Sequence, residues 1–150
     1  MLFHIFNSQE ERHDYGGSAF IEIQLCRLPV GTKLKKIVAV SSINDWQNDS
    51  LYIDDVDLFY KEYSHIFHCG IYNNLKSGVV DIFGINYYPP ELLDSIINRV
   101  NTDKPMNYEM LVEWLKQVKD YNGFYIFKEV SGSHGGGAYT GQCSYGVSGR

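Results

Sequence analysis

The chain has 150 residues, of which 44% are hydrophobic and 21% charged, and its formal net charge is -5. A chain of this length is typical of one domain with one hydrophobic core. Its acidic pI, near 5.4, argues against nucleic acid as the main partner. No stretch approaches the roughly 18 consecutive apolar residues that a membrane-spanning helix needs. We therefore expect a globular domain that binds neither nucleic acid nor a membrane.

The N-terminus and the cysteines bear on the compartment. Residues 1–6 are apolar, but the charged residues Glu10, Glu11 and Arg12 follow closely, so the segment does not resemble a secretion signal. The three cysteines are odd in number and widely spaced, which fits reduced thiols better than a disulfide framework. These features predict a cytoplasmic protein.

Two strands are predicted first along the chain. Residues 18–28 alternate, with Phe20, Glu22, Gln24 and Cys26 on one face and Ile21, Ile23 and Leu25 on the other. A period of two predicts a strand with one buried face. After a turn at residues 29–31, residues 34–43 are predicted to form a second strand and a hairpin with the first. The basic run Lys33, Lys35 and Lys36 is interpreted as the solvated end of that strand.

A polar loop at residues 44–50 precedes the first predicted helix. From Asp54 onward the apolar residues recur at helical spacing, at Val56, Phe59, Tyr63 and Ile66. The carboxylates of Asp54, Asp55 and Asp57 would lie in its first turns, where the positive end of the helix dipole stabilises negative charge.

The remaining elements are predicted as follows. Residues 65–72 and 79–85 form a strand, a turn and a strand, and Tyr87 to Pro90 stop the second strand. One helix begins at Pro90, and the next has an N-cap at Asn107 and closes at Asn122-Gly123. Residues 124–130 form the last strand. This order predicts an α+β two-layer sandwich with a mainly antiparallel sheet and about three helices.

The last twenty residues differ in composition from the rest. Residues 131–150 hold seven of the fourteen glycines and contain no Asp, Glu, Leu, Ile or Phe. Such a segment cannot bury enough apolar surface to offset the entropy cost of ordering it. We therefore expect a single domain at residues 1–130 and a flexible Gly/Ser-rich tail at residues 131–150.

The most informative feature is an acidic segment without compensating cations. Residues 37–60 contain no lysine or arginine, and five aspartates are interleaved there with aromatic residues. A local negative field with aromatic anchors attracts and holds a basic partner. The predicted partner-binding residues are Asp45, Trp46, Asp49, Tyr52, Asp54, Asp55, Asp57 and Tyr60. Trp46 has an alternative role as a lid over the core, whereas Trp114 lies on the apolar stripe of a helix and is expected in the core.

The sequence patterns that could indicate catalysis or metal binding are less specific than the acidic segment. In a strand, His65 and Cys69 would share a face and His68 would point the other way. A zinc site would need two further ligands, and a cysteine nucleophile would need a base and an orienting group that the sequence does not mark. The pair Asp55 and Asp57 resembles an Asp-x-Asp metal motif that is common by chance. We therefore predict no catalytic residues, no metal and no cofactor.

The second half of the chain resembles a known class of proteins. Segments 86–93, 104–105, 111–115 and 121–126 (NYYPPELL, KP, LVEWL and YNGFYI) are similar in layout to the C-terminal half of small bacterial immunity proteins. These are encoded beside polymorphic and contact-dependent inhibition toxins. The resemblance implies a cytoplasmic, non-enzymatic inhibitor that binds a cognate toxin, often a basic nuclease, and blocks its active site or substrate face.

The sequence therefore leaves three hypotheses. The first is an immunity protein, a monomer or weak homodimer, that neutralises a basic toxin through the acidic segment. The second is a small hydrolase or transferase that uses the aspartates with His65 or His68, and it requires a pocket that joins a histidine to two carboxylates. The third is an adaptor that self-associates through an edge of its sheet.

Overall fold

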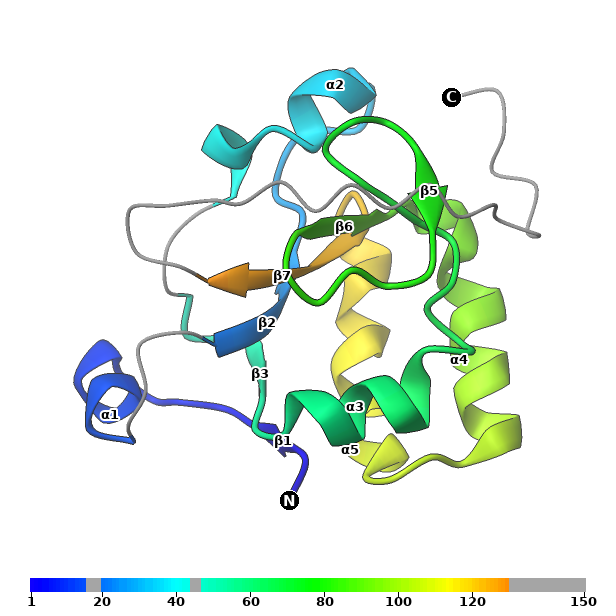
Figure 1. Ribbon diagram of the computed structural model, residues 1–150. Helices are drawn as coiled ribbons and strands as arrows, with labels where there is room; N and C mark the ends of the chain where they lie inside the picture. Colours follow the sequence, from blue (N-terminus) through cyan, green and yellow to red (C-terminus); the bar gives the residue numbers. More distant parts are fainter. Residues whose placement is uncertain (16–19, 44–46, 130–150) are drawn as a thin grey trace.

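The fold is that of an α+β protein with one antiparallel sheet (Figure 1). The computed structural model describes residues 1–15, 20–43 and 47–129. The strands are β1 (Phe3–His4), β2 (Phe20–Leu25), β3 (Leu51–Ile53), β4 (Gly70–Ile71), β5 (Ser77–Gly78), β6 (Ile85–Tyr88) and β7 (Phe124–Glu129). The α-helices are α1 (Gln9–Asp14), α2 (Leu34–Ile37), α3 (Val56–Tyr63), α4 (Leu93–Asp103) and α5 (Tyr108–Leu115), and the 3₁₀ helices are η1 (Val40–Ser42), η2 (Pro90–Leu92) and η3 (Lys116–Asp120).

The strand order of the sheet is β1-β3-β2-β7-β6-β4-β5, and every described pair of neighbours is antiparallel. β7 pairs with β2 through six residue pairs on one side and with β6 through four on the other. The last strand of the described chain therefore lies in the middle of the sheet. It joins the half made of β1, β3 and β2 to the half made of β6, β4 and β5.

The two faces of the sheet bury different side chains. Helices α3, α4 and α5 pack on one face, where Ile21, Ile23, Phe124 and Ile126 belong to the main core. On the other face a smaller core contains Ile37 and Val38, at the end of α2, with Tyr87, Tyr125 and Phe127. The main sandwich is the predicted one, and α2 adds a partial cover on the second face.

Several predicted elements are confirmed. β2 lies within residues 18–28, α3 begins where the helical spacing begins, and α4, α5 and β7 lie within the predicted segments. Pro90 starts η2, at the entry to α4. Asn107 precedes α5, but its side chain makes no cap hydrogen bond there and instead accepts one from the backbone N–H of Leu2, at 2.8 Å.

Other predictions are wrong. Residues 34–43 form α2 and η1, because Leu34, Ile37 and Val38 have the i, i+3, i+4 spacing of a helix face. No hairpin therefore forms there, and β2 pairs with β3 and β7 instead. β2 is also buried on both faces, since Glu22 and Gln24 are 0% and 1% exposed.

The region after α3 also differs from its prediction. The chain turns back at the end of the helix, where the N–H groups of Ile66 and Phe67 donate to the carbonyl of Tyr63. Strand structure is then confined to β4 and β5, which form a short hairpin. Tyr87 and Tyr88, predicted to stop a strand, are the last two residues of β6 and are both buried.

The predicted tail lies outside the described residues, so the division at residue 130 stays a prediction. Within the described ranges, no helix combines the length and the apolar character needed to cross a membrane. Both edges of the sheet, β1 and β5, are strands of only two residues.

We expect buried tyrosines to make the fold sensitive to alkali. Burial raises the pKa of Tyr63, Tyr88 and Tyr125 above the ordinary value near 10. As the pH rises, these tyrosines lose their protons in the unfolded chain before they do so in the folded chain. The stability that the buried, protonated tyrosines contribute is therefore fully present below pH 10 and is lost as the pH rises above it. Tyrosinate absorbance and circular dichroism should change together in an alkaline titration.

The Tyr63→Phe variant is the matched control for this titration. It should show a shallower alkaline decline, because one protected proton is gone. Ionisation of all twelve tyrosines while the circular dichroism stays native would contradict the prediction.

Candidate functional site: an exposed acidic face at the start of α3

The acidic segment folds into β3, a two-residue connection and the start of α3. Asp54 and Asp55 form the connection, and Asp57 lies in the first turn of the helix. The carboxylate of Asp55 accepts a hydrogen bond from the backbone N–H of Leu58 at 3.0 Å, so Asp55 is the N-cap of α3. The helix dipole also favours the negative charge of Asp57. Part of the acidity therefore stabilises the protein's own helix.

The same carboxylates are nevertheless open to solvent. Asp54, Asp55 and Asp57 are exposed, and within the described ranges none of them takes part in an ion pair. The nearest cation along the helix is Lys61, one turn beyond Asp57. Tyr60, on the same helix, is 40% exposed.

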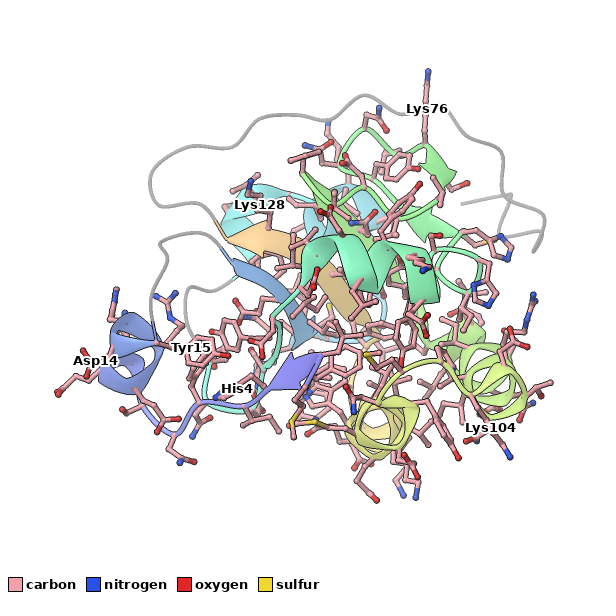
Figure 2. The ribbon with its side chains drawn as sticks, turned by 60° about the horizontal axis from the view of Figure 1, so that its bottom comes forward. His4, Asp14, Tyr15, Lys76, Lys104 and Lys128 are labelled. Carbon is pink, nitrogen blue, oxygen red and sulfur yellow. The ribbon has the colours of Figure 1, made fainter. Side chains whose placement is uncertain are left out.

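Tyr15, at the end of α1, extends this surface. Its side chain is 50% exposed, and its hydroxyl donates a hydrogen bond to Oδ2 of Asp54 at 3.0 Å. This hydrogen bond raises the pKa of Tyr15. The Tyr15 ring lies 4.6 Å from that of His4, and Figure 2 shows both residues well apart from the labelled Lys76 and Lys104. We call Tyr15, Asp54, Asp55, Asp57 and Tyr60 the α3 acidic face.

Tyr15 is not among the predicted site residues, because no sequence pattern links it to the acidic segment. The interaction with Asp54 spans 39 residues, and α1 itself was not predicted. An exposed N-cap serine, Ser8, which accepts from the N–H of Glu11 at 3.0 Å, is the one local signal that could have located α1.

Two of the predicted site residues have contacts within the protein, and one of them, Tyr52, is corrected. Asp49 receives two hydrogen bonds from Nη2 of Arg27, at 2.7 and 2.5 Å, so its charge is compensated within the protein. Tyr52 is 1% exposed: it lies in the middle of β3, between β1 and β2, and its ring packs 4.9 Å from Phe6. Tyr52 is therefore a core residue and cannot offer contact area to a partner. Asp45 and Trp46 lie outside the described residues.

Trp114 is in the core, as predicted. It is 5% exposed and packs edge-on against Phe124, 6.2 Å between ring centroids. Its indole N–H donates to the carbonyl of Asp49 at 2.6 Å. The indole thus holds the loop before β3 in place, which positions the start of the acidic face.

The histidines after α3 do not lie on a strand: His65 is exposed and His68 is half-buried. Nε2 of His65 lies 2.8 Å from Oδ2 of Asp103, which also accepts from Nε of Arg99 at 2.9 Å. These two hydrogen bonds lower the pKa of Asp103. Burial, and then the positive charge of Arg99, lower the pKa of His68. In the described part of the chain, no three His, Cys, Asp or Glu side chains are grouped to hold a metal.

The cysteines differ from one another. Cys26 is a buried free thiol, whose sulfur lies 3.5 Å from the hydroxyl of Tyr125. Cys69 is disulfide-bonded. The expectation of reduced thiols is therefore confirmed for Cys26 and wrong for Cys69.

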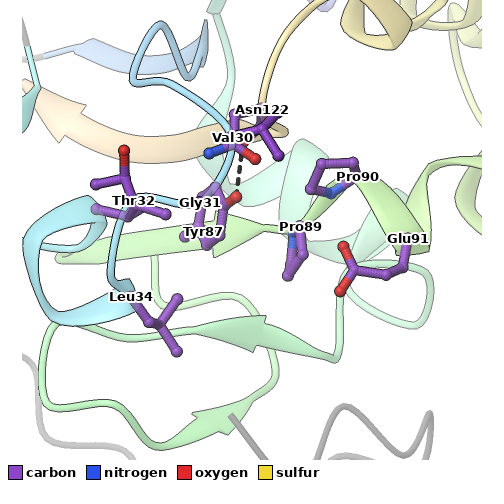
Figure 3. Close-up of a pocket in the computed structure, with 10 residues that line it drawn as sticks. Val30, Gly31, Thr32, Leu34, Tyr87, Pro89, Pro90, Glu91 and Asn122 are labelled. Carbon is purple, nitrogen blue, oxygen red and sulfur yellow. Dashed lines mark hydrogen bonds between the residues drawn. The ribbon is translucent and has the colours of Figure 1, made fainter.

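A pocket of about 330 Å³ lies beside the turn that follows β2 (Figure 3). It is lined by residues of the segments 30–34 and 87–91, together with Ile37 and Asn122. The hydroxyl of Tyr87 donates to the Asn122 carbonyl at 2.6 Å, and the Asn122 side chain donates to the carbonyl of Pro29 at 3.1 Å. Glu91 is the one acidic residue among those that line it, and no histidine lines it. The pocket therefore lacks the histidine and paired carboxylates that the enzyme hypothesis requires.

Comparison with protein-family models, with curated proteins and with solved structures gave no match to this chain.

Proposed function

We propose that this chain is an immunity protein that binds and neutralises a basic toxin domain through the α3 acidic face. The observation that carries the proposal is the exposure of Asp54, Asp55 and Asp57 without an ion pair in the described ranges. The partly exposed Tyr15 and Tyr60 flank these carboxylates. The layout of the second half of the chain adds independent support, because it resembles that of immunity proteins.

Charge and aromatic area have separate roles in this proposal. The carboxylates steer a basic partner toward the surface and so raise the association rate. Once the complex has formed, the tyrosine rings supply large contact area at a low entropy cost, which slows dissociation. The carboxylates would occupy the positions that phosphates take in the substrate of a basic nuclease.

We expect the neighbouring reading frame to encode a secreted toxin, and the test uses that protein. Its C-terminal domain is produced in cells with and without this chain, and survival is measured. Calorimetry with the purified domain then measures the affinity of Asp57→Asn and Tyr60→Ala. We expect this chain to rescue growth, and we expect each variant to weaken binding about tenfold or more.

The control variants separate binding from folding. Asp55→Ser removes the charge while a serine still caps α3, so its melting temperature should change little. Asp94→Asn removes an exposed carboxylate from α4 and should leave the affinity unchanged. Failure to rescue growth would contradict the proposed function, whereas rescue with unchanged affinity in all α3 variants would contradict the proposed surface.

The other two hypotheses receive no specific support. Self-association through a sheet edge needs a long row of open backbone groups, and β1 and β5 offer two residues each. The pocket between residues 30–34 and 87–91 does not join a histidine to two carboxylates. The absence of catalytic activity, metal and cofactor remains part of the proposal.

A further inference from the structure

A second pocket, of about 250 Å³, lies between the end of β2, helix α2 and η1. It is lined by Gln24, Leu25, Arg27, Leu28, Lys36, Ser41 and Ser42. This set contains two cations and two hydroxyls but no carboxylate. The lining is opposite in charge to the α3 acidic face, so the two surfaces suit ligands of opposite charge.

The charge of this region follows from the sequence. Between Glu22 and Asp45 the chain has no acidic residue, and it has four cations: Arg27, Lys33, Lys35 and Lys36. The lysines were interpreted as the solvated end of a strand, but they lie at α2, and Lys36 reaches a pocket wall. The fold thus concentrates positive charge in a hollow, where it acts on a ligand more strongly than on a flat surface.

Two contacts hold the guanidinium of Arg27 in place beside the pocket. Asp49 binds only its Nη2, and the ring of Tyr121 lies 5.8 Å from its guanidinium carbon. A guanidinium has five N–H donors, so Nε and Nη1 can still donate to an anion. Asp49 offsets the charge of Arg27, but Lys36 is in no ion pair within the described residues, so the described side chains that line the pocket keep a net positive charge.

The two serines contribute differently. The hydroxyl of Ser42 donates to the carbonyl of Lys36, which ties η1 to α2 and joins the two walls that carry the polar groups. Ser41 is exposed, and its hydroxyl can donate to a ligand. Leu28 is the apolar side chain that lines the remaining side, because the Leu25 side chain is buried in the main core on the other face of the sheet.

We infer that this pocket binds a small phosphomonoester, with its phosphate between Arg27, Lys36 and Ser41 and its organic part against Leu28. A phosphate dianion accepts several charge-assisted hydrogen bonds, which guanidinium, ammonium and hydroxyl groups supply. The volume lies below the roughly 300–1,000 Å³ of pockets for drug-sized ligands, so the ligand is small. This site is separate from the α3 acidic face and does not depend on the proposed function.

The test is calorimetry of the full chain with glycerol 2-phosphate and with inorganic phosphate, at fixed ionic strength. We expect saturable binding of the ester and weaker binding of inorganic phosphate, which has no organic part to contact Leu28. Lys36→Met should weaken binding of the ester about tenfold or more, as the loss of a hydrogen bond to a charged group does. Ser41→Ala should have a smaller effect of the same sign.

The matched control is Lys35→Met, which removes a neighbouring charge on α2 that does not line the pocket. It should change the affinity by less than about threefold, because an exposed charge at a distance is screened by solvent and salt. Melting curves of the variants check that each one folds. No saturable binding of the ester, or equal losses in Lys35→Met and Lys36→Met, would overturn the assignment. Equal affinity for inorganic phosphate would overturn the choice of an ester.

Discussion

Replacing Gly123 with alanine is expected to lower the free energy of unfolding by about 3–5 kcal/mol. Gly123 has a φ of +88°, which disfavours any residue with a Cβ. An added Cβ would also lie 2.3 Å from the carbonyl oxygen of Tyr88, and that atom is backbone. The turn before β7 would have to move, and β7 holds the two halves of the sheet together. Thermal or urea unfolding of the variant measures the loss.

Gly31 offers a matched control for this substitution. Its φ is +96°, close to that of Gly123, but an added Cβ there would meet nothing within 4 Å. Gly31→Ala should therefore cost only the backbone term, about 1–2 kcal/mol. The difference between the two variants isolates the close approach to Tyr88. Equal losses would mean that steric contact at Gly123 contributes nothing.

Replacing Asn86 with alanine is expected to cost about 3 kcal/mol or more, because three buried backbone groups lose their partner. The Asn86 side chain is fully buried in β6. Its oxygen accepts from the N–H of Asp81 at 2.8 Å, and its amide donates to the carbonyls of Asp81 and Ile126, each at 2.9 Å. It therefore fixes the loop before β6 to β7.

The control for Asn86 is Asn101→Ala, at an exposed position of α4, which should change the stability by no more than about 0.5 kcal/mol. Urea unfolding of both variants gives the comparison. A loss at Asn86 as small as that at Asn101 would show that water replaces the amide without cost and would contradict the proposed role.

The helices that cover the main core were predictable from the sequence. In α3, α4 and α5 the apolar residues repeat at helical spacing over two turns or more, and burial of that stripe determines the element. Helix α2 was missed because it has a single turn, and a single turn at Leu34 to Val38 is ambiguous with a strand. Strand β3 was missed because three apolar residues inside an aspartate-rich segment look like part of a loop.

The candidate site was predictable only in part, for a related reason. The capping of α3 by Asp55 is a local feature that its neighbours in sequence reveal. The pairing of Arg27 with Asp49 and of Tyr15 with Asp54 spans 22 and 39 residues, so it depends on how the sheet brings distant segments together. Composition could not show that the Tyr52 side chain is buried, because tyrosine has an apolar ring and a polar hydroxyl and suits both a core and a contact surface.

The central position of β7 has a consequence for biosynthesis. Until Phe124–Glu129 has left the ribosome, the segments made earlier can form only two incomplete sheets, each with an open edge, at β2 or at β6, that exposes backbone groups and apolar side chains. Closure of the domain must therefore wait for almost the whole described chain, and long-range pairing of this kind is slow. Nascent chains that stall before residue 124 are expected to be targets for chaperones and proteases.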